Sequence, residues 1–526
     1  MGALDVNGIS CRIPGGDVLF SDVTFRAGNG EHVALIGANG AGKTTLLRAI
    51  TGDVPVDRGS VHIDGELRVM TQLVGWRDED RTVRALLLAL SPPALRRAGE
   101  ALDTAEAANE REPGERTGLA LARAHAMWGD AGGWDAEVLW DTCTTIAVRQ
   151  PLPAAAVRRL STLSGGEQKR LALEVLLRSD AEVLLLDEPD NYLDVAGKRW
   201  LEEAIRATPK TVLVISHDRA LLDIVADKVV TLEGHTSWTH GAPFATWHEA
   251  RDARIARIDE DHRRFREERK RLEQSLQEFR RRAAMGSDKF ASRVRSTKSK
   301  IERFDATAPT ERVRDEQVSM KLGGNRTGTR VIVCEQLELD GLTDPFDFEM
   351  LFSERIAVLG PNGTGKSHFL RLLAGEPVGH SGTWRLGARV VPGYFSQTHD
   401  RPELRGVAVL DTVMNAGHGR GKAMATLRRY GLHGGATQPF ETLSGGQQAR
   451  LQILLLELSG ANLLLLDEPT DNLDLASAEA LEEALDSFFG TVLAVTHDRW
   501  FLRRFDRFLS FGRDCSVAEH LDPVFA

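Results

Sequence analysis

The feature that most constrains this chain is a set of short motifs that occurs twice, in the same order, once in each half. Each set begins with a glycine-rich loop that ends in Gly-Lys-Thr or Gly-Lys-Ser, at residues 37–44 and 360–367. Leu-Ser-Gly-Gly, an Asp-Glu pair and a His follow in both halves. The Ser precedes the Glu by 24 residues, and the Glu precedes the His by 29 residues, in both sets. This equal spacing indicates that one module has been duplicated within the chain.

The two glycine-rich loops predict phosphate-binding sites. Each loop follows a short apolar segment, at 32–36 and 355–359, that predicts a buried strand. Backbone N–H groups of such a loop surround nucleotide phosphates, and its Lys contacts the β- and γ-oxygens. The predicted nucleotide-binding residues of the loops are Gly37, Asn39, Gly40, Gly42, Lys43, Thr44, Thr45, Gly360, Asn362, Gly363, Gly365, Lys366, Ser367 and His368.

Acidic residues end a second apolar run in each half, at 183–186 and 463–466. An Asp at the end of such a strand can hold Mg²⁺ together with the loop hydroxyl. The next residue is Glu, whose side chain alternates to the other side and can act as the base for an attacking water. The predicted metal ligands are Thr44, Asp187, Ser367 and Asp467, and the predicted bases are Glu188 and Glu468.

The remaining polar candidates differ in strength. His217 and His497 follow apolar strands in a duplicated Ser/Thr-His-Asp-Arg context, which favours a γ-phosphate sensor over an ordinary loop histidine. Gln72 and Gln397 stand about 30 residues after the two loop lysines. Either glutamine can orient the water or contact the metal, but an ordinary polar loop residue is an equal alternative.

Composition places the chain among globular proteins. Of its 526 residues, 42% are hydrophobic and 27% are charged, and its longest apolar runs are of strand length. The start has no basic region followed by an apolar core, so a secretion signal is not expected. The four Cys residues lie far apart, which argues against disulfides, zinc sites and iron–sulfur clusters. We therefore expect a cytoplasmic protein without a membrane span.

A basic segment between the two motif sets contrasts with the net charge of -10. Residues 251–303 contain 18 Lys and Arg against 10 Asp and Glu. Within an acidic protein, such a segment concentrates positive potential and suits docking on phosphate. The alternative is a solvated charged helix face, which is the usual meaning of a charge run.

Apolar residues repeat every seven positions in this segment, at Ile258, Phe265, Leu272 and Phe279. After a break at 285–288, Phe290, Thr297 and Phe304 repeat the same period. Two consecutive heptad stripes predict two helices packed as an antiparallel hairpin, the first spanning about residues 247–285. The basic residues near its tip are Arg280, Arg281, Arg282, Lys289, Arg293, Arg295, Lys298 and Lys300.

The complete motif set resembles the ATP-binding cassette ATPases, which are α/β proteins. The resemblance implies Mg²⁺-dependent hydrolysis of ATP to ADP and phosphate. It also implies that two cassettes of this chain pair head to tail, within a monomer, so that the LSGG of one covers the loop of the other. One composite site would then combine Lys43, Asp187, Glu188 and His217 with Ser444, Gly445, Gly446 and Gln447, and the other Lys366, Asp467, Glu468 and His497 with Ser164, Gly165, Gly166 and Glu167.

Among these ATPases, the chain resembles the ABC-F branch, whose two P-loop cassettes flank a two-helix linker. The expected domains are a first cassette at 1–242, a helical linker at 243–325 and a second cassette at 326–526. The first cassette holds 43 more residues between its Lys and its LSGG than the second. These extra residues, at about 76–140, predict a helical arm of the kind found in that branch, or a simpler variation of the helical subdomain. Within them, residues 96–126 are rich in Ala, Glu and Arg and predict an exposed amphipathic helix.

The ABC-F resemblance implies action on the ribosome, with the basic hairpin directed toward rRNA and tRNA. Two uses remain open, a regulator of translation and a factor that protects the ribosome from antibiotics. The alternative from another class is the ATPase subunit of a transporter with separate membrane subunits. The DNA-binding coil that some members carry at the C-terminus is not expected. Two departures from the family pattern are His368 after the second loop and Asp190 where the second half has Thr470.

Overall fold

The computed structural model describes residues 2–12, 16–70, 81–284, 288–308, 318–396, 401–471 and 473–524. Gln72, Gln397 and the Lys289 side chain lie outside the described residues. The chain divides into two compact units, one formed by residues 1–239 together with 316–526 and the other by residues 240–315.

The first cassette is built on a six-stranded sheet that carries the predicted motifs at the ends of its strands. The sheet has the order β5-β6-β7-β3-β8-β9, and the neighbours from β5 to β8 are parallel. A three-stranded antiparallel sheet, β2-β1-β4, completes it. The strands are β1 (Ala3–Arg12), β2 (Val18–Ala27), β3 (His32–Gly37), β4 (Arg58–Asp64), β5 (Leu67–Met70), β6 (Val183–Asp187), β7 (Thr211–Ile215), β8 (Lys228–Glu233) and β9 (Thr236–His240).

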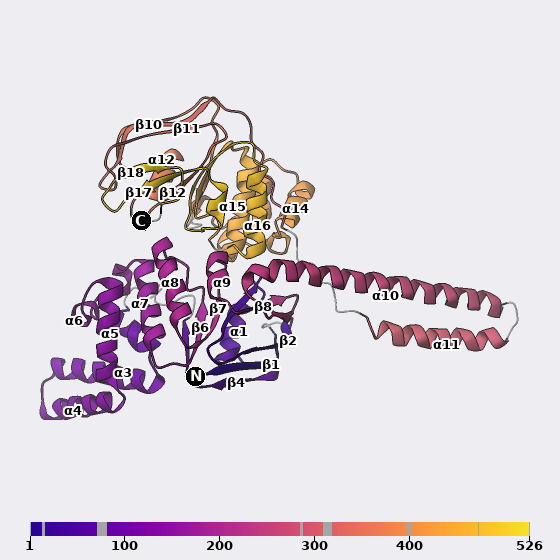
Figure 1. Ribbon diagram of the computed structural model, residues 1–526, viewed down its shortest axis with the longest axis horizontal. Helices are drawn as coiled ribbons and strands as arrows, with labels where there is room; N and C mark the ends of the chain where they lie inside the picture. The colour runs from indigo at the N-terminus through magenta and orange to yellow at the C-terminus, as the bar shows by residue number, and fades with distance from the viewer. Residues whose placement is uncertain are drawn as a thin grey trace. The chain divides into compact units, whose positions relative to one another are not determined.

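Helices cover the strands of this cassette (Figure 1). Strands β3, β6 and β7 are almost entirely buried, because parallel strands between helices have no solvent face. The helices are α1 (Lys43–Ile50), α2 (Val83–Leu90), α3 (Pro93–Arg111), α4 (Glu115–Asp130), α5 (Gly133–Val148), α6 (Leu152–Ala155), α7 (Gly165–Arg178), α8 (Val195–Ala207) and α9 (Arg219–Val225), with a 3₁₀ turn, η1, at Leu160–Thr162.

The second cassette repeats this plan with a sheet of order β14-β15-β16-β12-β17-β18 and a smaller sheet, β11-β10-β13. Its strands are β10 (Arg330–Leu339), β11 (Phe346–Leu351), β12 (Arg355–Leu359), β13 (His380–Leu386), β14 (Pro392–Phe395), β15 (Leu463–Asp467), β16 (Thr491–Val495), β17 (Arg507–Phe511) and β18 (Val517–His520). Its helices are α12 (Lys366–Leu373), α13 (Val409–Asn415), α14 (Arg420–Arg429), α15 (Gly445–Ser459) and α16 (Leu475–Asp486), with 3₁₀ turns η3 (Pro402–Leu404), η4 (His433–Gly435), η5 (Phe440–Thr442) and η6 (Phe501–Arg504).

The extra residues of the first cassette form helices α3, α4 and α5. One helix was expected across 96–126, but two helices, α3 and α4, occupy this stretch and meet at a turn around Pro113 and Gly114. Trp128 and Trp140 are fully buried, with ring centroids 5.9 Å apart, whereas Trp134 is half exposed. Two large aromatic side chains therefore anchor this helical group to its own core.

The second unit contains the predicted pair of helices, α10 (Trp247–Ala284) and α11 (Asp288–Asp305), after a short 3₁₀ turn, η2 (Phe244–Thr246). The ring of Phe265 stacks on that of Phe304, with centroids 4.6 Å apart, and Phe279 contacts Phe290 at 6.1 Å. These pairings run in opposite directions along the two helices, so the expected antiparallel hairpin is confirmed (Figure 1).

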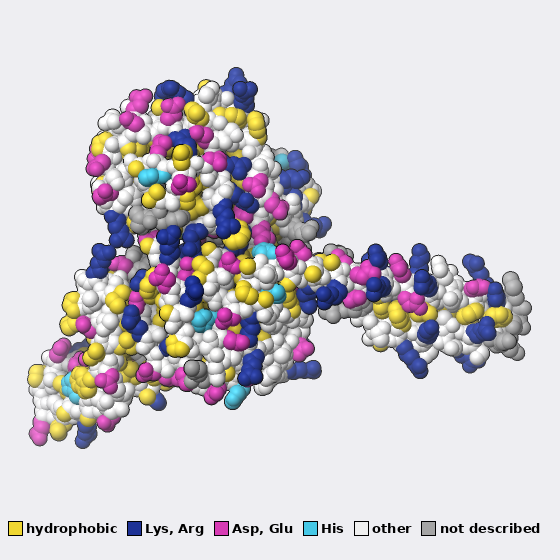
Figure 2. Space-filling view, in the orientation of Figure 1, with side chains coloured by type: hydrophobic (Ala, Val, Ile, Leu, Met, Phe, Trp, Pro, Cys, Tyr) yellow, Lys and Arg dark blue, Asp and Glu magenta, His cyan; other side chains and the backbone are white. Residues whose placement is uncertain are grey.

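Lys and Arg side chains are spread along the hairpin with acidic side chains between them (Figure 2). Salt bridges within the hairpin use part of this charge: Arg269 binds Asp305 and Glu273, and Arg264 binds Glu260. The exposed basic residues near the tip are Arg280, Arg281, Arg282, Arg293, Arg295, Lys298 and Lys300.

Candidate ATP sites between the cassettes

The first glycine-rich loop joins β3 to α1. Gly42 precedes the helix with a φ of 96°, a conformation that favours glycine. The next residue, Lys43, folds its side chain back over the loop, and its Nζ donates to the carbonyl oxygens of Gly37 at 2.7 Å and Ala38 at 3.2 Å. Burial lowers the pKa of this ammonium, while the charges of nearby carboxylates oppose the shift. The lysine thus lies inside the loop that is predicted to hold phosphate.

The two predicted metal ligands of the first cassette are neighbours. The Thr44 hydroxyl donates to Oδ2 of Asp187 at 3.0 Å, although the two residues are 143 positions apart in the chain. Burial raises the pKa of the Asp187 carboxyl, and the hydrogen bond from Thr44 opposes this. A hydroxyl oxygen beside a carboxylate oxygen is a donor set that Mg²⁺ accepts together with nucleotide phosphates and water.

The second loop repeats this geometry between β12 and α12. Nζ of Lys366 donates to the carbonyl oxygens of Gly360 and Pro361, each at 2.7 Å. Burial first, and then the charge of Glu468, raises the pKa of the Asp467 carboxyl to about 7, against a hydrogen bond from Ser367. Oδ1 of Asp467 is buried without a hydrogen-bond partner. A cation at this position would satisfy that oxygen.

The two predicted bases share an uncommon backbone conformation. Glu188 and Glu468 have φ values of 49° and 48°, in the left-handed region where few residues other than glycine occur. Their amides donate to the carbonyls of Ile215 at 2.8 Å and Val495 at 2.9 Å, so each stays tied to the adjacent strand. Repetition of the same strained geometry in both cassettes is typical of a functional position.

Different neighbours hold the two glutamate side chains. The Asn191 amide donates to Oε2 of Glu188 at 2.7 Å, and the Lys169 ammonium donates to the Glu188 carbonyl at 2.8 Å. In the second cassette, the backbone N–H of His497 donates to Oε2 of Glu468 at 3.0 Å. The roles of Asn191 and Lys169 were missed from the sequence, because neither position matches its counterpart in the other half, Asp471 and Ala449.

The two predicted histidines lie beside the glycine-rich loops, with His497 buried and His217 partly buried. Burial, followed by the charge of Lys43, lowers the pKa of His217 to about 3. Burial and then Lys366 lower the pKa of His497 to about 3. Both ring nitrogens of His217 lack a hydrogen-bond partner, whereas Nε2 of His497 lies 3.4 Å from Glu468. Both imidazoles are therefore neutral near pH 7, and each has a nitrogen available for a phosphate oxygen or a water.

The LSGG motifs begin helices α7 and α15. Ser164 is the N-cap of α7 and accepts from the Glu167 amide, while the Glu167 carboxylate accepts from the Ser164 amide at 2.7 Å. Ser444 and Gln447 form the same capping box on α15. The helix N-terminus, with its partial positive charge, suits binding of an anion.

One cavity of about 340 Å³ combines residues of both cassettes. The first cassette contributes Ser164, Gly165 and Gly166, and the second contributes its glycine-rich loop. At the rim, the Asn362 amide donates to the Tyr192 carbonyl at 3.2 Å. The predicted residues that line this cavity are Ser164, Gly165, Gly166, Asn362, Gly363, Gly365, Lys366, Ser367, His368, Asp467, Glu468 and His497.

The first loop meets the second cassette through a different group. The backbone N–H of Asn39 donates to Oδ2 of Asp474 at 2.9 Å, and the charge of Asp474 also acts on Lys43 and His217. A smaller cavity contains Glu188 and His217 beside Thr470 and Asp471 of the second cassette. For Ser444, Gly445 and Gly446, the described contacts give only their place at the start of α15, so their part in the first composite site stays a prediction.

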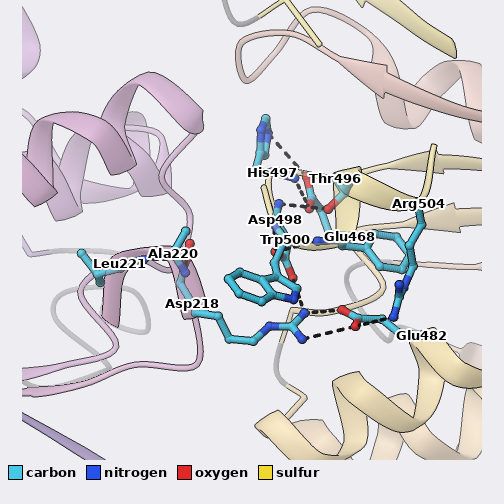
Figure 3. Close-up of polar contacts among 12 residues, drawn as sticks. Asp218, Ala220, Leu221, Glu468, Glu482, Thr496, His497, Asp498, Trp500 and Arg504 are labelled. Atoms are coloured by element: carbon cyan, nitrogen blue, oxygen red, sulfur yellow. Dashed lines mark hydrogen bonds and ion pairs between the residues drawn. The ribbon is translucent and has the colours of Figure 1, made fainter. Parts of the chain in front are cut away.

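Two ion pairs join the cassettes at equivalent positions, one buried and the other partly buried. The Arg219 guanidinium binds the Glu482 carboxylate in two hydrogen bonds, one of 3.2 Å, and Arg499 binds Glu202 in the same way. Figure 3 shows Glu482 beside Arg504, with Trp500 near the site. These pairs were not predicted from the sequence. A signal was present, since each Arg follows the predicted His by two residues in both halves.

The comparisons with known proteins agree with this geometry. The family model described as ABC transporter matches residues 20–191 and 343–471. An "Antibiotic resistance protein" of Mycobacteroides abscessus is 50% identical over 550 residues, covering 99% of this chain and 100% of the relative. The "Energy-dependent translational throttle protein EttA" of Mycobacterium tuberculosis is 30% identical over 93% of this chain and 88% of its own length.

Further comparisons define the branch. The human "ATP-binding cassette sub-family F member 3" is 30% identical over 94% of this chain and 70% of its own length. The solved archaeal ribosome recycling factor aABCE1 has the same fold, with a TM-score of 0.55, 19% identity, and coverage of 96% of this chain and 87% of that one. In the part of the chain that the structure describes, no helix is both long and apolar enough to span a membrane. The transporter-subunit alternative is not favoured by these relatives, and the chain belongs to the ABC-F branch of the ATP-binding cassette family, as an ATPase with two cassettes.

Proposed function

We propose that each cassette binds MgATP against the LSGG helix of the other. The observation that carries this proposal is the cavity shared by Ser164–Gly166 and the second glycine-rich loop. Lys43 and Lys366 would contact the β- and γ-phosphate oxygens, and the LSGG helix N-termini would face the γ-phosphate. The loop residues Thr45, His368 and the glycines would shape the phosphate cradle.

Metal binding is part of this proposal. Thr44 with Asp187, and Ser367 with Asp467, supply oxygen ligands of the type that Mg²⁺ prefers. When bound, Mg²⁺ would neutralise charge on the β- and γ-phosphates. The unpartnered Oδ1 of Asp467 supports this assignment in the second site.

In the hydrolysis step, Glu188 and Glu468 accept the proton of a water that attacks the γ-phosphorus, and the bond to the β–γ bridging oxygen breaks to release ADP. The imidazoles of His217 and His497, neutral near pH 7, would hydrogen-bond the γ-phosphate or the water. Gln72 and Gln397, which lie outside the described residues, remain candidates for orienting that water.

We further propose that the ribosome is the partner, in the cytoplasm and with this chain as a monomer. The hairpin supports this, because its exposed basic residues near the tip suit rRNA or tRNA phosphates. The relatives named for translation and for antibiotic resistance support the same partner. Protection of the ribosome from an antibiotic is the use we favour, since the relative named for antibiotic resistance is 50% identical across the chain. Regulation of translation is the second use.

The experiment compares the wild type with the double variant Glu188→Gln/Glu468→Gln. The amides preserve the size of the side chains but cannot accept the water proton, so ATP should bind, close the cassettes and remain. Steady-state ATPase activity should fall to background, and the variant should sediment with 70S ribosomes only when ATP is present. Retained turnover would refute the assignment of the bases. Loss of turnover without ATP-dependent sedimentation would refute the ribosome as partner.

A further inference from the structure

The contact between the cassettes contains equivalent ion pairs, and also a lysine, Lys198, whose counterpart is not charged. The ion pairs Arg219–Glu482 and Arg499–Glu202 are equivalent, since each residue has its counterpart 280 positions along the chain. By the same spacing, Ala478 is the counterpart of Lys198. The first cassette therefore places a lysine in this contact where the second has a methyl group.

Lys198 is buried, with 8% of its surface exposed, in the first turns of α8. Its Nζ forms an ion pair of 2.9 Å with Oδ2 of Asp218. The other oxygen of Asp218 accepts from the amides of Ala220 and Leu221, and so caps α9 immediately after His217. Through Asp218, Lys198 thus contacts the loop of the first cassette that carries His217.

Lys198 also lies beside residues of the second cassette. Lys198 lines the cavity that contains Glu468 and His497, and it also lines the smaller cavity that contains Glu188 and His217. Among the residues that line these two cavities, Lys198 shares this double position with Asp190 and Asp471 alone. A basic residue between two acidic ones therefore forms a common wall of both candidate sites.

Opposite charges on Lys198 and the acidic residues around it attract one another within this shared wall. Burial lowers the pKa of the Lys198 ammonium, but the charges of Asp218, Asp190 and Asp471 outweigh burial and raise it overall, so the group stays protonated. Burial and then Glu468 raise the pKa of the Asp471 carboxyl to about 8, and Lys198 opposes this. Without the lysine, the acidic groups would face one another in a buried contact.

We propose that Lys198 is a positioning residue for hydrolysis at the second composite site, which it serves from the first cassette. This inference rests on the proposed function of Glu188 and Glu468 as the two bases. The Asp471 amide donates to the carbonyl of Glu468 at 3.1 Å, so the two residues belong to one tight turn. The charge of the Lys198 ammonium acts on the carboxyl groups of both Glu468 and Asp471, and it sets where the Glu468 side chain stands relative to the γ-phosphate. The counterpart Ala478 offers nothing equivalent to the first site.

The test measures kcat and KM for ATP in two backgrounds. Glu188→Gln leaves turnover to the second site, and Glu468→Gln leaves it to the first. In the Glu188→Gln background, Lys198→Ala should lower kcat roughly tenfold or more, because misplaced groups cost rate, while KM changes less than about threefold. Lys198→Arg should restore at least half of the activity. In the Glu468→Gln background, the factor by which Lys198→Ala lowers kcat should be at least about fivefold smaller than in the Glu188→Gln background.

Controls separate a positioning role from a general loss of structure. Arg199→Ala removes an exposed cation from the same helix and should leave kcat in both backgrounds within about twofold. If Lys198→Ala unfolds at a lower temperature, Lys198→Met, which keeps the aliphatic stem, replaces it. If either Glu→Gln change silences both sites, kcat of Lys198→Ala and Lys198→Arg is compared in the wild-type background.

The outcomes are distinguishable. Equal losses of kcat in the two backgrounds, or a rise in KM without a fall in kcat, would overturn the role of Lys198. Failure of Lys198→Arg to recover activity would also overturn it, because a positive charge alone would then not suffice. Residual turnover in the Glu188→Gln/Glu468→Gln double variant would instead refute the proposed function on which this inference rests.

Discussion

The buried pair Arg219–Glu482 gives a quantitative prediction about closure of the cassettes. Both side chains are almost inaccessible, with 4% and 3% exposed, and the two residues come from opposite cassettes. Replacing Arg219 by Met preserves much of its volume but removes the charge. Glu482→Gln removes the other charge, and the double variant removes both.

The magnitude follows from the distances. A charge pair at 3.2 Å with an effective dielectric constant of about 20 gains roughly 5 kcal/mol, most of which is offset by the cost of removing both ions from water. Glu482 keeps Arg504 at 3.0 Å as a second partner, so the loss of Arg219 leaves it partly compensated. We therefore expect a coupling energy of about 2 kcal/mol, which corresponds to roughly 30-fold in an equilibrium constant.

The assay is a double-mutant cycle on ATP binding. All four proteins carry Glu188→Gln and Glu468→Gln, so that bound ATP is not hydrolysed during the measurement. A pair that forms only when the cassettes meet contributes to the apparent affinity for ATP, because binding is linked to closure. Each single change should weaken the apparent Kd more than tenfold, and the double change should weaken it by less than the product of the two.

The matched control is Arg371–Glu376, an ion pair of 2.6 Å within the second cassette whose side chains are 43% and 39% exposed. Its coupling energy should lie below about 1 kcal/mol, because exposed pairs contribute little. A coupling energy below about 0.5 kcal/mol for Arg219–Glu482 would refute the reasoning, since it would mean that the pair does not close the cassettes.

Two further predictions concern the hairpin and the buried histidines. The triple variant Arg280→Gln/Arg281→Gln/Arg282→Gln should weaken binding to ribosomes and flatten the dependence of log K on log salt by about 0.7–0.9 per lost phosphate contact. The ATPase activity of the free protein should not change. An unaltered salt slope would show that these side chains do not contact RNA phosphates. The pKa values of His217 and His497 are about 3 when folded, against about 6.5 when unfolded, so the unfolded chain binds more protons between these values and stability falls as pH drops through that window. His217→Asn/His497→Asn should therefore show a shallower decline of the urea midpoint between pH 6.5 and pH 4, and an identical decline would contradict the pKa shifts.

The sequence predicted those helices and strands that are determined by the pattern of neighbouring residues. Period-seven apolar residues indicated two paired helices, and the stacking of Phe265 on Phe304 and of Phe279 on Phe290 follows that pattern. The apolar segment at 32–36 became β3, which ends at the first glycine-rich loop. In contrast, the break between α3 and α4 was missed, although Pro113-Gly114 is a strong turn signal.

Contacts between the cassettes were harder to predict, because they depend on how two folded modules meet. The family resemblance implied that the LSGG of the first cassette would face the second loop, and residues of both line one cavity. Nothing in the sequence indicated that Asp474 would accept a hydrogen bond from the backbone N–H of Asn39. A side chain of a given type becomes a partner only through the three-dimensional arrangement of residues that are 435 positions apart.

Duplication also changes how departures from a pattern are interpreted. A buried lysine in an isolated cassette could simply stabilise its own helix cap, as Lys198 does for Asp218. Because the second cassette provides Ala478 at the equivalent position, this cap demonstrably does not require a lysine: Asp498 accepts from the amides of Trp500 and Phe501 without one. The additional charge faces Asp190 of its own cassette, where the second cassette has Thr470, and Asp471 of the partner cassette. For this reason the asymmetry, rather than the shared motifs, points to a difference between the two ATP sites.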